Sequence, residues 1–346
     1  MSELSKYAAS CVRVHGMRDC LLSREDWQRF LQTGSAAGII SQLYHKNLVS
    51  SASLEVREAE KEIRGNVIKA AEKIMRFVPR SVGEMLAFFI YYFDLINLET
   101  VITRLHRMNE DMPLKTLLYD TGRFGLFSLS DLTEINNFIM LEELLKKSFF
   151  SDPFNLALGF YKENEILADF LASLEFAFLD QWRQIIGRVN RLKTKDIPST
   201  FEVFLLTKSV MSAMRLKFAR KRKEYDVQRF IGVPLQPFSL KTLRAAMEID
   251  EPGKVFHNLT QTIFPKSLAK KLEGREIDIK LMEIRLKELI LETARKHQLK
   301  SGFSAEYLIS FQFIKMVEAD NIITLLECKN NHMDIEEAKN YLVGVT

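Results

Sequence analysis

The sequence contains little of what an all-β, disulfide-stabilised or membrane-spanning protein needs. It has 14 Gly and 8 Pro in 346 residues, too few for the turn that an all-β chain makes about every ten residues. Its three cysteines are odd in number and lack metal-ligand spacing, so we expect free thiols in a reducing compartment. The longest apolar run, residues 85–93, is far shorter than the roughly 20 residues that span a bilayer.

Sequence motifs of nucleotide binding, metal coordination and hydrolysis are also missing. The chain has no GxxxxGK[ST], GxGxxG, GxSxG or HExxH pattern, and its six histidines are scattered. No stretch brings together a nucleophile, a base and oxyanion donors. A net charge of +4 does not by itself imply nucleic acid. We therefore predict no catalytic residue, no metal ligand and no cofactor.

Apolar residues recur at helical spacing along nearly the whole chain, and no segment alternates as a strand does. We predict helices over residues 7–22, 24–31, 54–77, 81–108, 131–148, 164–194, 201–230, 240–248, 265–272, 277–299, from 305 onward, and 334–343. Four of them have a serine N-cap: Ser23, Ser130, Ser239 and Ser304. Turns are expected at residues 34–38, 122–126, 232–237 and 250–253. The predicted fold class is all-α, with helical hairpins as the unit.

Two of these helices carry the same pattern in the same register. Residues 89–102 align without gaps on residues 313–326, and each has apolar residues, an acid, an asparagine three positions later and then a threonine. Residues three apart share a helix face, so acid and amide stand side by side. The pairs are Asp94 with Asn97, and Glu318 with Asn321. Two matches of this kind indicate a repeated structural unit, whereas a catalytic site normally occurs once.

The first copy of the pattern also includes Arg104, within an arc of about 80° from Asp94 and Asn97. Asp94 could accept a proton in a reaction. Alternatively, Asp94 and Asn97 could hydrogen-bond a neighbouring helix end while Arg104 neutralises the charge. The second copy has Cys328 in place of Arg104, and a catalytic triad would not survive that loss. We therefore favour a docking role for both pairs.

A basic run occupies residues 215–229, with aromatic residues interleaved. Its first cations are Arg215, Lys217, Arg220, Lys221, Arg222 and Lys223. Such a run could bind phosphate groups, which would make the protein a nucleic-acid-binding or regulatory adaptor. On a helix, however, the aromatics can form a buried stripe while the cations point to water or meet an acidic partner. We favour the solvated face. An enzyme with a site dispersed over several helices is a further alternative.

Four stretches of the chain, in order, resemble one known family. They are residues 12–23, which read VRVHGMR and then LLS; residues 92–98 with Arg104; residues 174–182, in which Asp180 precedes an aromatic; and residues 318–321 with the final helix. Together they resemble the central-stalk C-type component of bacterial and archaeal V/A-type ATPases, whose eukaryotic counterpart is the d-type component of the vacuolar ATPase. The resemblance runs from residue 5 to about residue 343. Residues 201–215 depart from it, because Leu205 and Lys208 stand where a third acid and asparagine are expected.

This resemblance implies a funnel-like, all-α protein of three related subdomains, approximately residues 1–112, 113–230 and 231–346. It implies a non-catalytic subunit at the cytoplasmic face of the membrane, in a complex that couples ATP to H⁺ or Na⁺ transport. The implied partners are the proteolipid ring, the D- and F-type shaft subunits and the large membrane stator subunit, with no nucleic acid. The protein would act as a socket between the rotating shaft and the ring.

Overall fold

The computed structural model describes residues 3–107, 113–191, 199–219, 245–246, 248–262, 278–300 and 302–345. Over these ranges the chain forms helices and no strand, which confirms the all-α fold class. The chain divides into two compact units, each built from separate stretches of sequence. The first unit is Met1–Val101, Glu110–Glu134 and Leu291–Thr346, and the second is Ile102–Asn109 and Ile135–Ile290. The threefold division stays a prediction.

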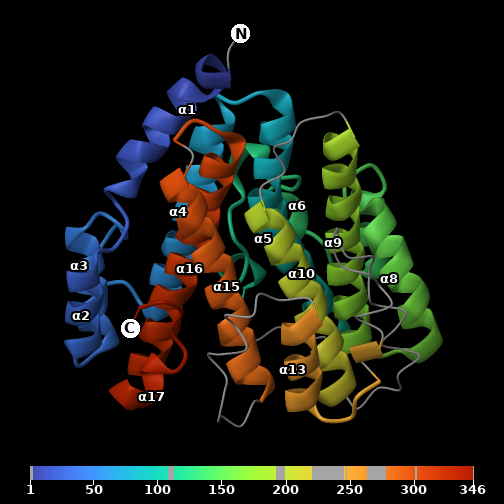
Figure 1. The fold of residues 1–346 in the computed structure, drawn as a ribbon. Helices are drawn as coiled ribbons and strands as arrows, with labels where there is room; N and C mark the ends of the chain where they lie inside the picture. The colour runs from blue at the N-terminus through green and yellow to red at the C-terminus, as the bar shows by residue number, and fades with distance from the viewer. Residues whose placement is uncertain are drawn as a thin grey trace. The chain divides into compact units, whose positions relative to one another are not determined.

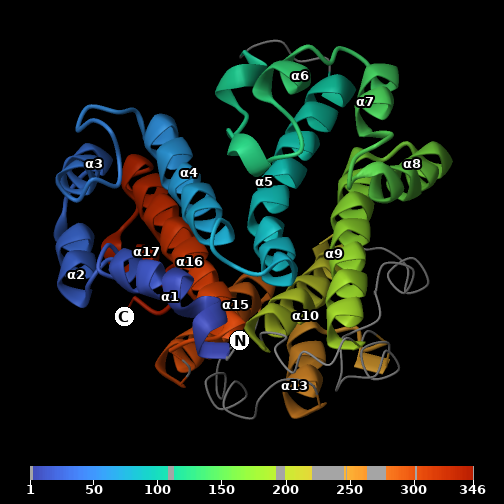
Figure 2. The same ribbon diagram turned by 90° about the horizontal axis from the view of Figure 1, so that it is seen from above.

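The first unit is organised around helix α16, which is buried along most of its length. In Figures 1 and 2 α16 lies beside α4 and close to α1, and all three pack together. Apolar side chains at helical spacing fill the core between them, such as Val67 of α4 and Phe313 of α16. The helices of this unit are α1 (Glu3–Arg18), α2 (Arg24–Gln32), α3 (Ala36–His45), α4 (Val56–Met75), most of α5 (Arg80–Arg107), the 3₁₀ turns η1 (Leu114–Thr116) and η2 (Gly122–Phe124), α6 (Leu129–Thr133), α16 (Ala305–Asn330) and α17 (Ile335–Lys339).

The second unit contains a long helical hairpin and a smaller helical cluster. Its helices are α7 (Phe138–Leu145), α8 (Ser151–Asn164), α9 (Leu167–Arg191), α10 (Ser199–Met214), the π-helical turn η3 (Arg215–Ala219), α13 (Pro252–Thr262) and most of α15 (Ile279–Lys300). Glu165 adopts φ 53° and ends α8, which lets α9 fold back along it. Aromatic rings pack between the two helices. The rings of Phe150 and Phe178 are stacked, with their centroids 5.5 Å apart and an angle of 6° between their planes.

The predicted helix starts are confirmed where a capping residue precedes a clear apolar period. Ser23 accepts a hydrogen bond from Asp26 N at 3.2 Å and forms a capping box with it. Ser304 accepts from the backbone three residues later, at 3.1 Å, and begins α16. Asp334 caps α17 by accepting from Glu336 N, two residues later, at 2.8 Å. These side chains satisfy amide groups that have no partner within the helix.

Several predictions of local structure are wrong. The single helix expected over residues 131–148 is two helices, α6 and α7, and Asn164, the expected start of the following helix, is the last residue of α8. The expected turn at residues 34–38 is half helical, because Ser35 caps α3 and Gly38 lies inside it. Ser128, not Ser130, caps the next helix, since Asp131 stands three residues after Ser128 and completes a capping box. The turn expected at 250–253 contains the start of α13, where Pro252 occupies a first-turn position that proline favours. Several expectations lie outside the described residues: residues 220–230 of the helix over 201–230, the turn at 232–237, the Ser239 cap, most of the helix over 240–248 and the helix over 265–272.

Helix α5 is long and apolar enough, by length and composition, to cross a membrane. Among the described residues it is the helix that meets this test, although its longest continuous apolar run is short. Most of the relevant window, 72%, is buried inside the protein. A core helix of a soluble protein can meet the same test by length and composition, and burial to this extent is typical of a core helix.

Candidate functional site: paired acid and asparagine side chains

Asn97 binds both backbone polar groups of a single residue in the segment that follows α5. Its Nδ2 donates to the Tyr119 carbonyl at 2.8 Å, and Tyr119 N donates to Asn97 Oδ1, also at 2.8 Å. The Asn97 side chain is fully buried. This arrangement, called here an amide clamp, fixes the returning segment against the helix.

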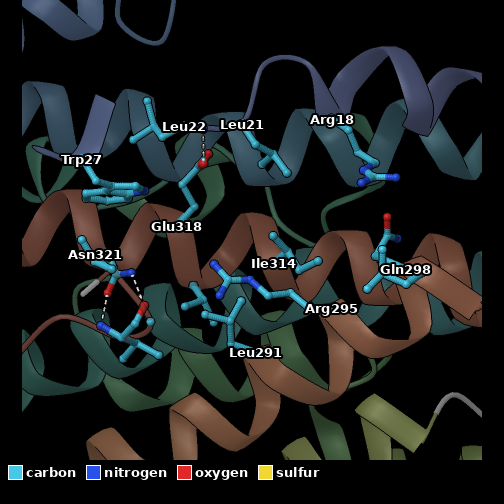
Figure 3. Close-up of a pocket in the computed structure, with 15 residues that line it drawn as sticks. Arg18, Leu21, Leu22, Trp27, Leu291, Arg295, Gln298, Ile314, Glu318 and Asn321 are labelled. Atoms are coloured by element: carbon cyan, nitrogen blue, oxygen red, sulfur yellow. Dashed lines mark hydrogen bonds between the residues drawn. The ribbon is translucent and has the colours of Figure 1, made fainter. Parts of the chain in front are cut away.

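Asn321 forms a second amide clamp of the same geometry. Its Nδ2 donates to the Val343 carbonyl at 2.9 Å, and Val343 N donates to Asn321 Oδ1 at 2.8 Å. Figure 3 shows both bonds. In each clamp the bound residue lies 22 positions after the asparagine. The repeated unit therefore includes the helix and the segment that folds back on it, which is the docking role that we favoured over catalysis.

The acids of the two pairs are buried like the amides, but they hold different segments. Asp94 accepts from Thr121 Oγ1 at 2.8 Å and from Leu126 N at 2.9 Å, both in the segment after α5. Glu318 accepts from Leu22 N at 2.6 Å and from Lys315 Nζ at 2.7 Å, so it holds the junction between α1 and α2. Burial raises the pKa of Asp94 to about 6, although both of its hydrogen bonds lower the pKa.

A polar network on α4 connects the two copies of the pattern. Tyr119, held by the first clamp, donates through its hydroxyl to Glu60 at 2.8 Å. Arg64, one turn along α4, lies 3.1 Å from Glu60 and 3.2 Å from Asp320. Asp320 directly precedes the clamp residue Asn321 in α16. Burial raises the pKa of Tyr119 to about 12, so its hydroxyl stays protonated and continues to donate. The three segments thus share one hydrogen-bonded layer within the first unit.

Arg104 lies in the last turn of α5, in the part of the helix that belongs to the second unit, and it is half-buried. Ten residues separate it from Asp94, which corresponds to about 15 Å along a helix. The partners found for Asp94 are Thr121 and Leu126. The neutralising role of Arg104 stays a prediction.

In the second unit a buried arginine of α9 makes a polar contact with α10. Asp180 is 44% exposed and lies 3.3 Å from Arg183, whose guanidinium is 5% exposed and donates to Ser209 of α10. Burial lowers the pKa of Arg183. Leu205 is buried, and Lys208 pairs with Glu175 at 3.6 Å. Sequence reasoning singled out Asp180 but missed Arg183, although its position one turn after Asp180 is a signal for an ion pair.

The basic run is described only at its start. Arg215 pairs with Glu283 of α15. Lys217 is 11% exposed, and its Nζ donates to the Ile249 carbonyl at 2.7 Å. The expectation that these cations point to water is therefore wrong for Lys217, because a neighbouring carbonyl satisfies it inside the unit. The remaining predicted positions, Arg220, Lys221, Arg222 and Lys223, lie outside the described residues.

The polar side chains of these clamps are already used in hydrogen bonds that hold neighbouring segments together. Each polar atom of Asp94, Asn97 and Asn321 faces a backbone group or a hydroxyl of its own unit. Among the described residues, no three His, Cys, Asp or Glu side chains gather as they would around a metal ion. Such saturated, buried hydrogen bonds fix the path of the chain.

The fold and the clamps define an all-α protein with a repeated helix-and-return unit, and comparison with known proteins identifies its family. Residues 10–341 match the ATP synthase (C/AC39) subunit family, and the chain belongs to it. It is 23% identical to the C-type component of the A-type ATP synthase of Methanosarcina acetivorans, over 99% of this chain and 94% of that protein. It is 22% identical to the corresponding A-type ATP synthase component of Methanosarcina mazei, over 98% and 93% of the two chains.

Proposed function

We propose that this protein is the non-catalytic central-stalk subunit of a rotary A/V-type ATPase or ATP synthase, acting as the socket that joins the rotating shaft to the membrane proteolipid ring. The family match over nearly the whole chain carries the proposal. The two relatives are named as components of A-type ATP synthases, and they are matched over almost their full length. A protein of this family made mainly of docked helices suits a mechanical role.

A torque-carrying protein has to resist deformation, and the first unit is built for resistance. The two amide clamps and Asp94 fix the segments that follow α5 and α16, so these segments cannot slide without breaking at least two hydrogen bonds each. Leaving a buried backbone group without a partner costs about 1–3 kcal/mol. Arg64 then ties α4 to α16. Small strains are therefore opposed by polar bonds as well as by close packing.

The proposed partners follow from the socket role. They are the proteolipid ring on one side, the D- and F-type shaft subunits on the other, and the large membrane stator subunit nearby. The location is the cytoplasmic face of the membrane, and the transported ion is H⁺ or Na⁺. We propose further that the isolated protein neither binds nor hydrolyses nucleotide, which is consistent with the absence of a phosphate-binding loop from the sequence.

The test is a paired measurement in membrane vesicles with and without the protein. We expect deletion to preserve phosphate release by the soluble sector and to abolish ATP-driven ion uptake, because the shaft then turns without being coupled to the ring. Adding back the purified protein should restore ion uptake and leave phosphate release largely unchanged. Ion uptake that persists at the same ratio to phosphate release after clean deletion would reject the socket role.

A further inference from the structure

A cavity of about 320 Å³ opens beside the second amide clamp, within the first unit. Its walls come from the end of α1, the start of α2, the last turns of α15, the middle of α16 and the segment after α17. Figure 3 shows ten of the lining residues labelled. The apolar part of the wall includes Leu21, Leu22, Trp27, Leu291, Leu299 and Ile314. This size and lining suit one or two residues of a peptide or a small organic molecule.

Gln298 lines the cavity and carries a buried acceptor that lacks a donor. Gln298 is 7% exposed, and its Nε2 donates to the Tyr307 carbonyl, which fixes the orientation of the amide group. Its Oε1 is buried and has no hydrogen-bond partner among the described residues. In Figure 3 this oxygen points toward the Arg18 guanidinium. A buried carbonyl without a donor is costly, so a ligand with an N–H or O–H group would gain from reaching it.

Two guanidinium groups line the same cavity. Among the described residues neither Arg18 nor Arg295 forms a salt bridge. The acid of the cavity, Glu318, is already engaged by Lys315 and by Leu22 N, so its charge is compensated. The cavity thus presents a positive potential next to an apolar wall. Arginine favours carboxylate ligands, because its planar donors match both carboxylate oxygens.

The rim of the cavity depends on a residue without a side chain. Gly344 adopts φ +63°, and a Cβ atom there would lie 2.7 Å from Leu291 Cδ2 and 3.4 Å from Arg295 Nη1. The chain can therefore turn closely over these two side chains. Leu299 lines the cavity and is 83% exposed, so an incoming aliphatic group would cover it.

We propose that this cavity binds the carboxy-terminal end of a partner peptide that finishes in an aliphatic residue. The terminal carboxylate would meet Arg18 and Arg295, the last backbone N–H would donate to Gln298 Oε1, and the aliphatic side chain would cover Leu299 and Ile314. This set of groups, a carboxylate, one donor and an apolar body in adjacent positions, is what the end of a peptide carries. The proposal goes beyond the stalk role and is tested on the purified chain alone.

The probe is an acetylated tetrapeptide ending in leucine, with a free carboxylate or with a carboxamide. Binding is measured by calorimetry and by the fluorescence of Trp27, which lines the cavity. We expect the carboxylate peptide to bind about tenfold more tightly than the carboxamide peptide. The Arg18→Met and Arg295→Met variants should each reduce this preference. Arg24→Met is the matched control, because Arg24 is exposed on α2 and does not line the cavity.

The Gln298→Met variant separates the acceptor from the charges. Since it removes the acceptor of the peptide N–H, it should weaken both peptides by the same factor and keep the carboxylate preference. Equal binding of the two peptides, a preference that survives loss of both arginines, or no binding at millimolar peptide would overturn the proposal. Binding that appears only after deletion of residues 344–346 would also overturn it, because this segment of the same chain would then be the occupant.

Discussion

Replacing Asn97 tests whether the amide clamp holds the segment after α5. Asn97→Ala removes an acceptor from Tyr119 N–H and a donor from the Tyr119 carbonyl, two bonds of 2.8 Å. Each orphaned group costs about 1–3 kcal/mol. Tyr119 is half-buried, so water can partly replace the lost bonds, and we expect a total of about 2–4 kcal/mol. The opening of this segment should then become at least roughly 30-fold more frequent.

Asn97→Asp gives a sharper test, because its effect depends on pH. One carboxylate oxygen can still accept from Tyr119 N, but the other faces the Tyr119 carbonyl, where the wild-type amide donates. The carboxyl must be protonated to donate, and Asp94 on the same helix face adds a like charge. The pKa of the new side chain is therefore raised in the folded state above its unfolded value of about 4. Its folded state binds more protons, so its stability is present at low pH and is lost as pH rises through the folded pKa.

The measurement is hydrogen exchange at the Tyr119 amide, at pH 5 and pH 8, corrected for intrinsic exchange rates. We expect Asn97→Ala to lose protection equally at both pH values relative to wild type, and Asn97→Asp to lose much less at pH 5 than at pH 8. Asn340→Ala serves as the control, because Asn340 is exposed and makes one local bond within its own helix. Unchanged Tyr119 protection in Asn97→Ala, or a pH-independent loss in Asn97→Asp, would refute the clamp reasoning.

Three further predictions follow from individual contacts. Burial raises the pKa of Asp94 to about 6 in the folded protein, so Asp94 binds its proton more tightly there than in the unfolded chain. The free energy of unfolding, measured relative to Asp94→Asn, should therefore fall by up to about 3 kcal/mol as the pH rises from 4 to 6. An NMR titration of the Asp94 carboxyl with a midpoint near pH 4 would contradict this. In urea unfolding, Asp180→Ala should lower the free energy of unfolding by about 1–2 kcal/mol more than Arg183→Met does. Asp180→Ala leaves the buried Arg183 guanidinium with Ser209 as its partner, whereas Arg183→Met leaves Asp180 exposed to water and the Ser209 hydroxyl bonded to the Leu205 carbonyl. A thiol reagent should label Cys20 rapidly and the other two cysteines slowly, since Cys20 is exposed, Cys328 is buried and burial raises the pKa of Cys11 to about 11; rapid labelling that survives Cys20→Ser would show that a buried thiol is accessible.

The sequence was sufficient to predict the all-α class and the two acid and asparagine pairs, because helical period and a repeated register are visible in the residues themselves. It was not sufficient to predict what the pairs bind. Tyr119 and Val343 share no side-chain chemistry, and the asparagines bind only their backbone groups. A backbone partner leaves no mark on the sequence of the partner segment. Only the equal spacing of 22 residues relates them, and this spacing becomes apparent once the hydrogen bonds are known.

Local capping explains several of the helix boundaries that were predicted wrongly. Ser128 and Ser130 are both good capping residues, and the choice depends on Asp131, which lies at the third helical position for Ser128. Pro252 and Gly253 indicate a turn when taken as a dipeptide, yet proline is also favoured in the first turn of a helix, and α13 begins there. Arg183 has no motif around it. Its importance comes from Ser209 on the next helix, a contact of tertiary structure.

The contrast between the two copies explains why the amide is reused and the acid is adapted. Asparagine carries one donor and one acceptor side by side, which match the N–H and C=O of any residue, so the clamp tolerates Tyr119 in one copy and Val343 in the other. A carboxylate only accepts, and it needs donors placed by a particular segment. Asp94 finds them in the segment after its own helix, whereas Glu318 finds them at the junction before α2 and in Lys315. The asparagine thus provides the common geometry of the repeat, and the acid determines which neighbouring segment each copy holds.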